Sequence, residues 1–81
     1  MTDYSPIDCG VYAGYEVAIL RRQSLMLSWR GEDGVVRVGV IRPTDLETRA
    51  GEEFLIGKTR QGEAVRLRLD RITQSRIVSV K

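Results

Sequence analysis

The side chains that could carry acid-base or nucleophilic chemistry are few in this sequence. It contains no histidine, the residue whose proton affinity best suits proton transfer near neutral pH. Its 11 carboxylates are dispersed, and only Glu32-Asp33 and Glu52-Glu53 stand next to each other. Catalysis by a pair of carboxylates then depends on acids that only the fold can bring together. The sequence therefore predicts a protein that is not an enzyme.

Cys9 is the only cysteine of the chain. One thiol cannot form an internal disulfide, and neither a second thiol nor a histidine is present to share a metal ion with it. No basic residue precedes Arg21 to stabilise a thiolate. We expect Cys9 to be a buried structural side chain, and we expect neither a metal nor another cofactor.

Charge is unevenly distributed along the chain. The net charge is +2, yet residues 1–20 contain three acids and no base. The same segment contains all three tyrosines, Tyr4, Tyr12 and Tyr15, and tyrosine is common in protein interfaces. Eleven of the 13 basic residues are arginines, whose planar side chains suit bidentate contacts with carboxylate or phosphate. The sequence thus offers two candidate binding surfaces, an acidic N-terminal segment and a set of arginines.

The clearest structural element is a strand over residues 64–72, where aliphatic and charged residues alternate. Successive side chains of a strand point to opposite faces. Leu67 and Leu69 are therefore expected in a core, and Arg66 and Arg68 are expected in water.

The outward arginines have two interpretations, and the sequence leaves both open. They could form a patch for RNA phosphates, or they could pair with nearby acids and form an ordinary solvated face. The arginines concerned are Arg30, Arg37, Arg66 and Arg68.

The N-terminal third predicts a short helix followed by an ambiguous stretch. Asp8 is a suitable N-cap for a helical turn from Cys9 to about Gly14. Between residues 15 and 22 a strand pattern competes with a helical stripe, and we favour a strand from Glu16 onward. The helical stripe would consist of Val11, Tyr15, Ala18 and Arg22.

The rest of the chain predicts two hairpins and a closing strand. In the first hairpin, Leu25, Leu27 and Trp29 point inward, and the turn Gly31-Glu32-Asp33-Gly34 leads to a strand over 35–41 with Val36, Val38 and Val40 on one face. Pro43 is expected to end that strand and to begin an irregular stretch over 42–52. In the second hairpin, Gln61-Gly62 joins a strand with Phe54 and Ile56 on one side to residues 64–72. Ile72, Ile77, Val78 and Val80 suggest the last strand.

Five or six short strands without a linker or repeat are typical of one small barrel or sandwich domain. The chain shows no run of apolar residues long enough to span a membrane and no signal peptide at its start. We therefore expect a cytoplasmic monomer that spans residues 1–81 as a single domain.

Seven segments occur in an order that is found in a known family. They are Tyr4-Ser5-Pro6-Ile7-Asp8-Cys9, Glu16-Val17-Ala18, Leu25-Met26-Leu27, Asp33-Gly34, Asp45-Leu46, Glu53-Phe54-Leu55 and Leu67-Arg68-Leu69-Asp70-Arg71-Ile72. With these motifs the chain resembles the Rof family of Rho-binding antiterminators, from about Tyr4 to Ile72. The first and last segments are the most specific.

The resemblance implies a mainly β, Sm-like or SH3-like antiparallel barrel with a short N-terminal helix and a partner-binding segment over residues 1–14. It also implies binding to the N-terminal RNA-binding domain of the transcription termination factor Rho, which obstructs the primary RNA site and reduces Rho-dependent termination. The implied binding residues are Asp8, Cys9, Tyr12, Glu16 and Arg49.

Two of these residues match the family residue by residue. Tyr12 matches a tyrosine of the helix, and Arg49 matches a basic residue in a loop that here covers residues 48–50. Well-known members carry aspartates in the helix, where this chain has Gly10, Val11 and Ala13.

Overall fold

The computed structural model describes residues 7–78, which form one α-helix and five strands. In chain order the elements are α1 (Cys9–Leu20), β1 (Ser24–Arg30), β2 (Val36–Arg49), β3 (Glu52–Thr59), β4 (Ala64–Arg68), the short 3-10 helix η1 (Leu69–Arg71) and β5 (Ile72–Val78). The strands are antiparallel to their neighbours in one sheet of order β4-β3-β2-β1-β5. The expected mainly β fold with an N-terminal helix is confirmed. Tyr4, a candidate interface residue, and Val80, expected in the last strand, lie outside the described residues.

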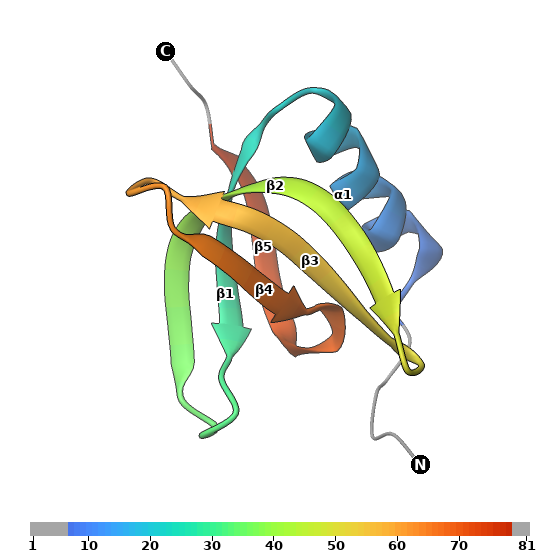
Figure 1. Cartoon of the computed structure of the whole chain (residues 1–81), viewed down its shortest axis with the longest axis vertical. Coiled ribbons are helices and arrows are strands. Elements are labelled where there is room, and N and C mark those ends of the chain that lie inside the picture. Colours follow the sequence, from blue (N-terminus) through green and yellow to red (C-terminus); the bar gives the residue numbers. More distant parts are fainter. Residues whose placement is uncertain (1–6, 79–81) are drawn as a thin grey trace.

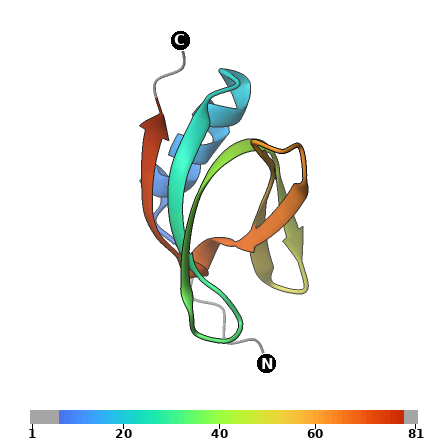
Figure 2. The ribbon, with the colours of Figure 1, turned by 90° about the vertical axis from the view of Figure 1, so that its left-hand side faces the viewer.

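The sheet is strongly curved, as Figure 1 and Figure 2 show from two directions. Its two outermost strands, β4 and β5, follow each other in sequence through η1. The sheet therefore curls toward itself as a small Sm-like barrel, with α1 packed against β2. No helix of the described part is long and apolar enough to cross a membrane.

The core is formed by aliphatic residues of the strands together with one side of α1. The predicted inward positions of the first hairpin and of residues 64–72 are confirmed, and Trp29 is half-buried against the same cluster. The buried cluster consists of Tyr15, Ala18, Leu25, Leu27, Ile41, Leu55, Leu67 and Leu69.

Helix α1 is longer than the sequence predicted. Asp8 is the N-cap as expected, since its Oδ2 accepts a hydrogen bond from the Gly10 backbone N–H at 2.9 Å. The strand expected from Glu16 onward is wrong, because the helix continues to Leu20. Its buried residues, Tyr15 and Ala18, are three positions apart, so they lie on one side of the helix and pack on the sheet. Tertiary burial thus outweighed the local strand-like alternation.

The β1–β2 hairpin has the predicted turn. Gly34 has a φ of +80°, and the Asp33 carboxylate accepts a hydrogen bond from the Val35 N–H at 3.0 Å. The face that carries Val36 and Val38 is the outer one, and both side chains are more than half exposed.

Strand β2 does not end at Pro43, and the irregular stretch predicted over 42–52 is wrong. β2 pairs with β1 only up to Ile41, so the missing N–H of Pro43 removes no bond to that neighbour. Beyond this point the strand continues beside β3, with a register shift between Pro43 and Asp45. Gly57 of β3 pairs with Pro43 and lets the two strand backbones come close together here. An added Cβ at Gly57 would lie 2.7 Å from the Arg42 carbonyl oxygen.

Strands β3 and β4 form the predicted second hairpin, with Gly62 at a φ of +85° in its turn. The strand predicted over residues 64–72 is wrong in its length, because β4 ends at Arg68 and the chain turns through η1 into β5. Leu55 of β3 is fully buried, whereas Phe54 and Ile56 lie on the other face and are half-buried. The last predicted strand is confirmed as β5, which pairs with β1.

Candidate functional site

Tyr12 lies where α1 meets the β2–β3 hairpin. Its side chain is half-buried and packs against the core. Partial burial raises the pKa of its hydroxyl above the usual 10.0, and the negative charges of Glu53, Glu16 and Asp45 raise it further. These three carboxylates come from β3, α1 and β2, so the fold gathers acids from distant parts of the chain around one tyrosine. We call Tyr12, Glu16, Asp45 and Glu53 the Tyr12 surface.

Apolar side chains are exposed at other positions of α1. Val11, Val17 and Leu20 are 47%, 42% and 81% exposed. A half-buried tyrosine among acids, on a helix that also exposes aliphatic residues, has the mixed composition of a protein interface. The helix therefore offers a partner both apolar area and negative charge.

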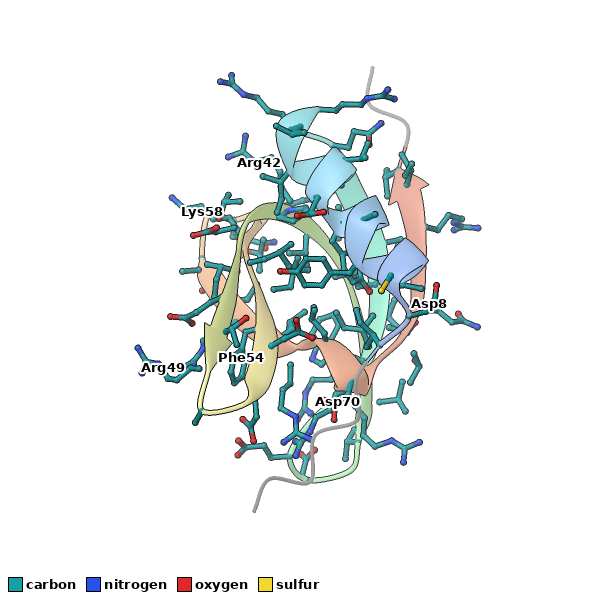
Figure 3. The ribbon with its side chains drawn as sticks, turned by 90° about the vertical axis from the view of Figure 1, so that its right-hand side faces the viewer. Asp8, Arg42, Arg49, Phe54, Lys58 and Asp70 are labelled. Atoms are coloured by element: carbon teal, nitrogen blue, oxygen red, sulfur yellow. The ribbon has the colours of Figure 1, made fainter. Side chains whose placement is uncertain are left out.

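The structure brings some of the predicted partner-binding residues together and separates others. Tyr12 and Glu16 belong to the Tyr12 surface, whereas Asp8 caps the start of the helix. Arg49 lies at the tip of the β2–β3 hairpin, and in Figure 3 it points away on the opposite side of the view from Asp8.

Cys9 is exposed, so the expectation of a buried structural cysteine is wrong. It is the first residue of α1 and precedes the turns that pack on the sheet. As an exposed residue beside the N-cap it is accessible to a partner.

The hairpin tip that carries Arg49 is well defined. Ala50 and Gly51 have φ angles of 53° and 80°, which is the pattern of a two-residue type I′ turn. The Arg49 side chain is 68% exposed and lies 3.7 Å from a carboxylate oxygen of Glu47. The loop expected over residues 48–50 is therefore the end of β2 and the first residue of a tight turn.

Asp45 and Glu53 were not predicted as members of the site. Both residues stand in segments that carry the resemblance, but the resemblance assigned neither of them a binding role. Only the pairing of β2 with β3, and the packing of α1 on β2, brings them near Tyr12. No spacing along the sequence could have shown this.

The four arginines of the second candidate surface do not form one patch. Arg37 is held in the β1–β2 turn, where its guanidinium donates two hydrogen bonds to the Asp33 carboxylate at 3.1 and 3.0 Å. This contact and the Val35 N–H lower the pKa of Asp33 to about 2. Arg37 is therefore engaged locally by the turn.

Arg68 was expected in water, and that expectation is wrong. Its side chain is only 13% exposed and donates two hydrogen bonds of 2.7 Å to Asp70, which is 7% exposed. It also lies 3.4 Å from Glu52. The chain turns into η1 directly after Arg68, and this places Asp70 beside it.

Of the two β4 arginines that were predicted to face water, Arg66 is the more exposed. Its guanidinium lies 4.0 Å from the centroid of the Phe54 ring and 3.2 Å from a carboxylate oxygen of Glu47. Its side chain remains 44% exposed. Such a stacked and paired arginine is held in place on the sheet surface.

Two hollows of the described surface lie beside the residues considered above. The larger, about 670 Å³, lies between α1 and β5 and is lined mostly by apolar atoms, including those of Val11 and Ile77. A second, about 470 Å³, lies beside β4 and contains Arg30, Arg66 and Arg68. Within the described residues, no group of three or more potential ligands is arranged to hold a metal ion.

Comparisons with known proteins bear on the fold. No protein-family model and no curated protein sequence matches the chain. Among solved structures, proteasome accessory factor B/C (PafBC) of Arthrobacter aurescens is similar, with a TM-score of 0.76 and 18% sequence identity over 95% of this chain. This chain spans only 12% of the length of the PafBC chain. At this identity the likeness shows a shared barrel-like fold.

Proposed function

We propose that this protein binds the N-terminal RNA-binding domain of the transcription termination factor Rho and obstructs its primary RNA site. The observation that carries the proposal is the Tyr12 surface, in which three carboxylates act on one half-buried tyrosine. A site that binds RNA must be basic, so an acidic surface of this kind is complementary to it.

The resemblance to the Rof family supports the choice of Rho as the partner. The motif around Asp8 and Cys9 opens α1, and Tyr12 follows on the next turn of the same helix. The motif Asp45-Leu46 and the segment that begins with Glu53 lie side by side in β2 and β3. The segments that carry the resemblance thus also build the Tyr12 surface.

The missing helix aspartates have a physical substitute in this chain. Gly10, Val11 and Ala13 add no negative charge to α1. Asp45 and Glu53 supply charge to the same tyrosine from the neighbouring strands. We infer that this chain uses fewer charges on the helix than a helix rich in aspartate, and that it draws negative charge from β2 and β3 instead.

The proposed mechanism is occlusion. When Rho docks on α1 and the β2–β3 hairpin, this chain covers the RNA site of Rho without a covalent step and without a cofactor. Arg49 at the hairpin tip can contact the rim of the interface. A protein that acts in this way works as a monomer in the cytoplasm, where Rho meets nascent RNA.

The proposal is tested by binding to immobilised full-length Rho in the absence of RNA, followed by addition of single-stranded RNA. We expect saturable binding, and we expect RNA to compete with it. The control is the same RNA mixed with the chain alone, so that direct RNA binding cannot imitate competition. Absence of binding, or a ternary complex in which RNA and the chain sit on Rho together, would contradict occlusion.

A gain-of-function variant sharpens this test. Ala13 is exposed on α1, and Ala13→Asp restores one acid of the family pattern. Because added charge complementarity mainly accelerates encounter, we expect a higher association rate at low salt and little change in dissociation. An association rate equal to that of the wild type would count against an electrostatically complementary site.

A further inference from the structure

A cavity beside β4 combines aromatic rings with arginines. Its volume is about 470 Å³, which is within the range of roughly 300–1,000 Å³ that is usual for small-molecule sites. Its lining residues come from the end of β1, the β1–β2 turn, the start of β3, β4 and η1. Its lining residues include Trp29, Phe54, Arg30, Arg66, Arg68 and Arg71.

The two aromatic residues come from different strands. Trp29 is half-buried against the core. Its ring packs over Gly39, because a Cβ added to Gly39 would lie 3.4 Å from the indole. Phe54 is half-buried on the outer face of β3 and already carries the Arg66 guanidinium at 4.0 Å. Rings held in this way are stacking surfaces of the kind that bind a planar base.

The charge of the cavity is positive. Four arginines line it against two glutamates, Glu32 and Glu52. Arg66 and Arg68 are paired with carboxylates, as described above. Arg30 and Arg71 form no ion pair with any residue between positions 7 and 78. These two guanidiniums are therefore available to an anion, and arginine suits phosphate through bidentate hydrogen bonds.

We propose that this cavity binds a nucleoside phosphate, with the base against Trp29 and Phe54 and the phosphate at Arg30 and Arg71. The ligand is either a free nucleotide or one unit of a single-stranded RNA, because both present the same base and phosphate. The site uses residues other than those of the Tyr12 surface, so it does not depend on Rho binding.

Trp29 is the only tryptophan of the chain, so its fluorescence reports on the cavity directly. The probes are uridine monophosphate, oligouridine RNA and inorganic phosphate, each titrated into the full chain. We expect saturable quenching by the nucleotide and by the RNA. A much higher affinity for the RNA, with a salt slope of about −0.7 per phosphate contacted, identifies RNA as the source. Equal affinities identify a free nucleotide.

Matched variants separate the site from general attraction of anions. Arg30→Ala and Arg71→Ala are each expected to weaken nucleotide binding roughly tenfold or more, since each loses a charge-assisted contact. Arg76→Ala removes the same charge from an exposed residue of β5 that does not line the cavity, and it is expected to leave the affinity unchanged. Phe54→Leu is expected to weaken binding of the nucleotide but not of inorganic phosphate. Arg30 is exposed, so its variant tests the site even where another variant fails to fold.

Three results would overturn the proposal. One is no saturable quenching at millimolar nucleotide. The second is an equal loss of affinity in Arg76→Ala and Arg30→Ala, which would mean non-specific electrostatics. The third is competition by inorganic phosphate as strong as that by uridine monophosphate, which would mean that the base makes no contact.

Discussion

Arg68 and Asp70 are joined by two hydrogen bonds of 2.7 Å, in a part of the surface that is nearly closed to solvent. Their side chains are 13% and 7% exposed. A carboxylate this close to complete burial is stable only while its charge is paired. The pair holds the turn from β4 into η1, and therefore the connection to β5.

Arg68→Ala is accordingly expected to destabilise the fold. It leaves the Asp70 carboxylate without its bidentate partner, and we expect the free energy of unfolding to fall by about 2–4 kcal/mol. Arg66→Ala, in the same strand but 44% exposed, is expected to cost less than about 1 kcal/mol. Denaturant unfolding of the two variants measures both values. Equal costs would mean that the Arg68 pair adds no more than a surface ion pair.

The turn between β2 and β3 holds a residue in an unfavourable conformation. Ala50 has a φ of 53°, and the left-handed region costs an L-residue roughly 1–2 kcal/mol. Asparagine followed by glycine is a preferred sequence for such a turn, so Ala50→Asn is expected to stabilise the protein by about 0.5–1 kcal/mol. Ala50→Val, with a branched Cβ, is expected to destabilise it. A thermal melt in which both variants lose stability would contradict the turn assignment.

The Asp33–Arg37 pair predicts a local pH dependence. The pKa of Asp33 is lowered from 3.8 to about 2, chiefly by the hydrogen bonds from Arg37. Because the folded value is below the unfolded one, the stabilisation is present above the unfolded value and is lost as the pH falls through about 2. Carboxyl chemical shifts followed by NMR should show this low value, and Arg37→Ala should return it toward 3.8. An unchanged pKa in that variant would remove Arg37 as the cause.

Tyr12 predicts a second pH dependence, of opposite sign. Burial and then the charges of Glu53, Glu16 and Asp45 raise the pKa of its hydroxyl, so the folded state holds the proton more tightly. The corresponding stability is present below the usual value of 10.0 and is lost as the pH rises through the folded value. Glu53→Gln should lower the pKa of Tyr12 in an NMR titration. Tyr15, whose pKa is raised by burial alone, serves as the internal control and should not move.

Local patterns predicted the elements whose burial follows a simple alternation. Leu67 and Leu69 were expected inside because their neighbours are charged, and Gly34 was expected in a turn because glycine accepts a positive φ. Asp8 was expected to cap the helix because its short side chain reaches the free N–H groups of the first turn. In these cases the local preference and the tertiary packing agree.

The remaining features depend on contacts that are distant in sequence. Pro43 was expected to end a strand, but β2 has already separated from β1 at that point and continues beside β3. The helix passes Gly14 because Tyr15 and Ala18 find a core that only the folded sheet provides. Asp45 and Glu53 reach Tyr12 for the same reason. The resemblance thus named Tyr12 and Glu16 of the site, whereas the roles of Asp45 and Glu53 followed only from the pairing of β2 with β3.

The central claim is that the Tyr12 surface is what docks on the RNA site of Rho. It is tested most directly by displacement of labelled single-stranded RNA from full-length Rho by the wild type and three variants. The variants are Tyr12→Ala, the double change Glu16→Gln with Asp45→Asn, and Glu63→Gln, which removes an exposed acid near the β3–β4 turn. Each variant is first shown to melt as the wild type does.

The account predicts that Tyr12→Ala displaces RNA about thirtyfold less well, which corresponds to a loss of about 2 kcal/mol for a buried interface tyrosine. The double change should weaken displacement and reduce its dependence on salt, because it removes charges that face a basic site. Glu63→Gln should act as the wild type. If folded Tyr12→Ala displaces RNA as efficiently as the wild type, the Tyr12 surface is not the docking site.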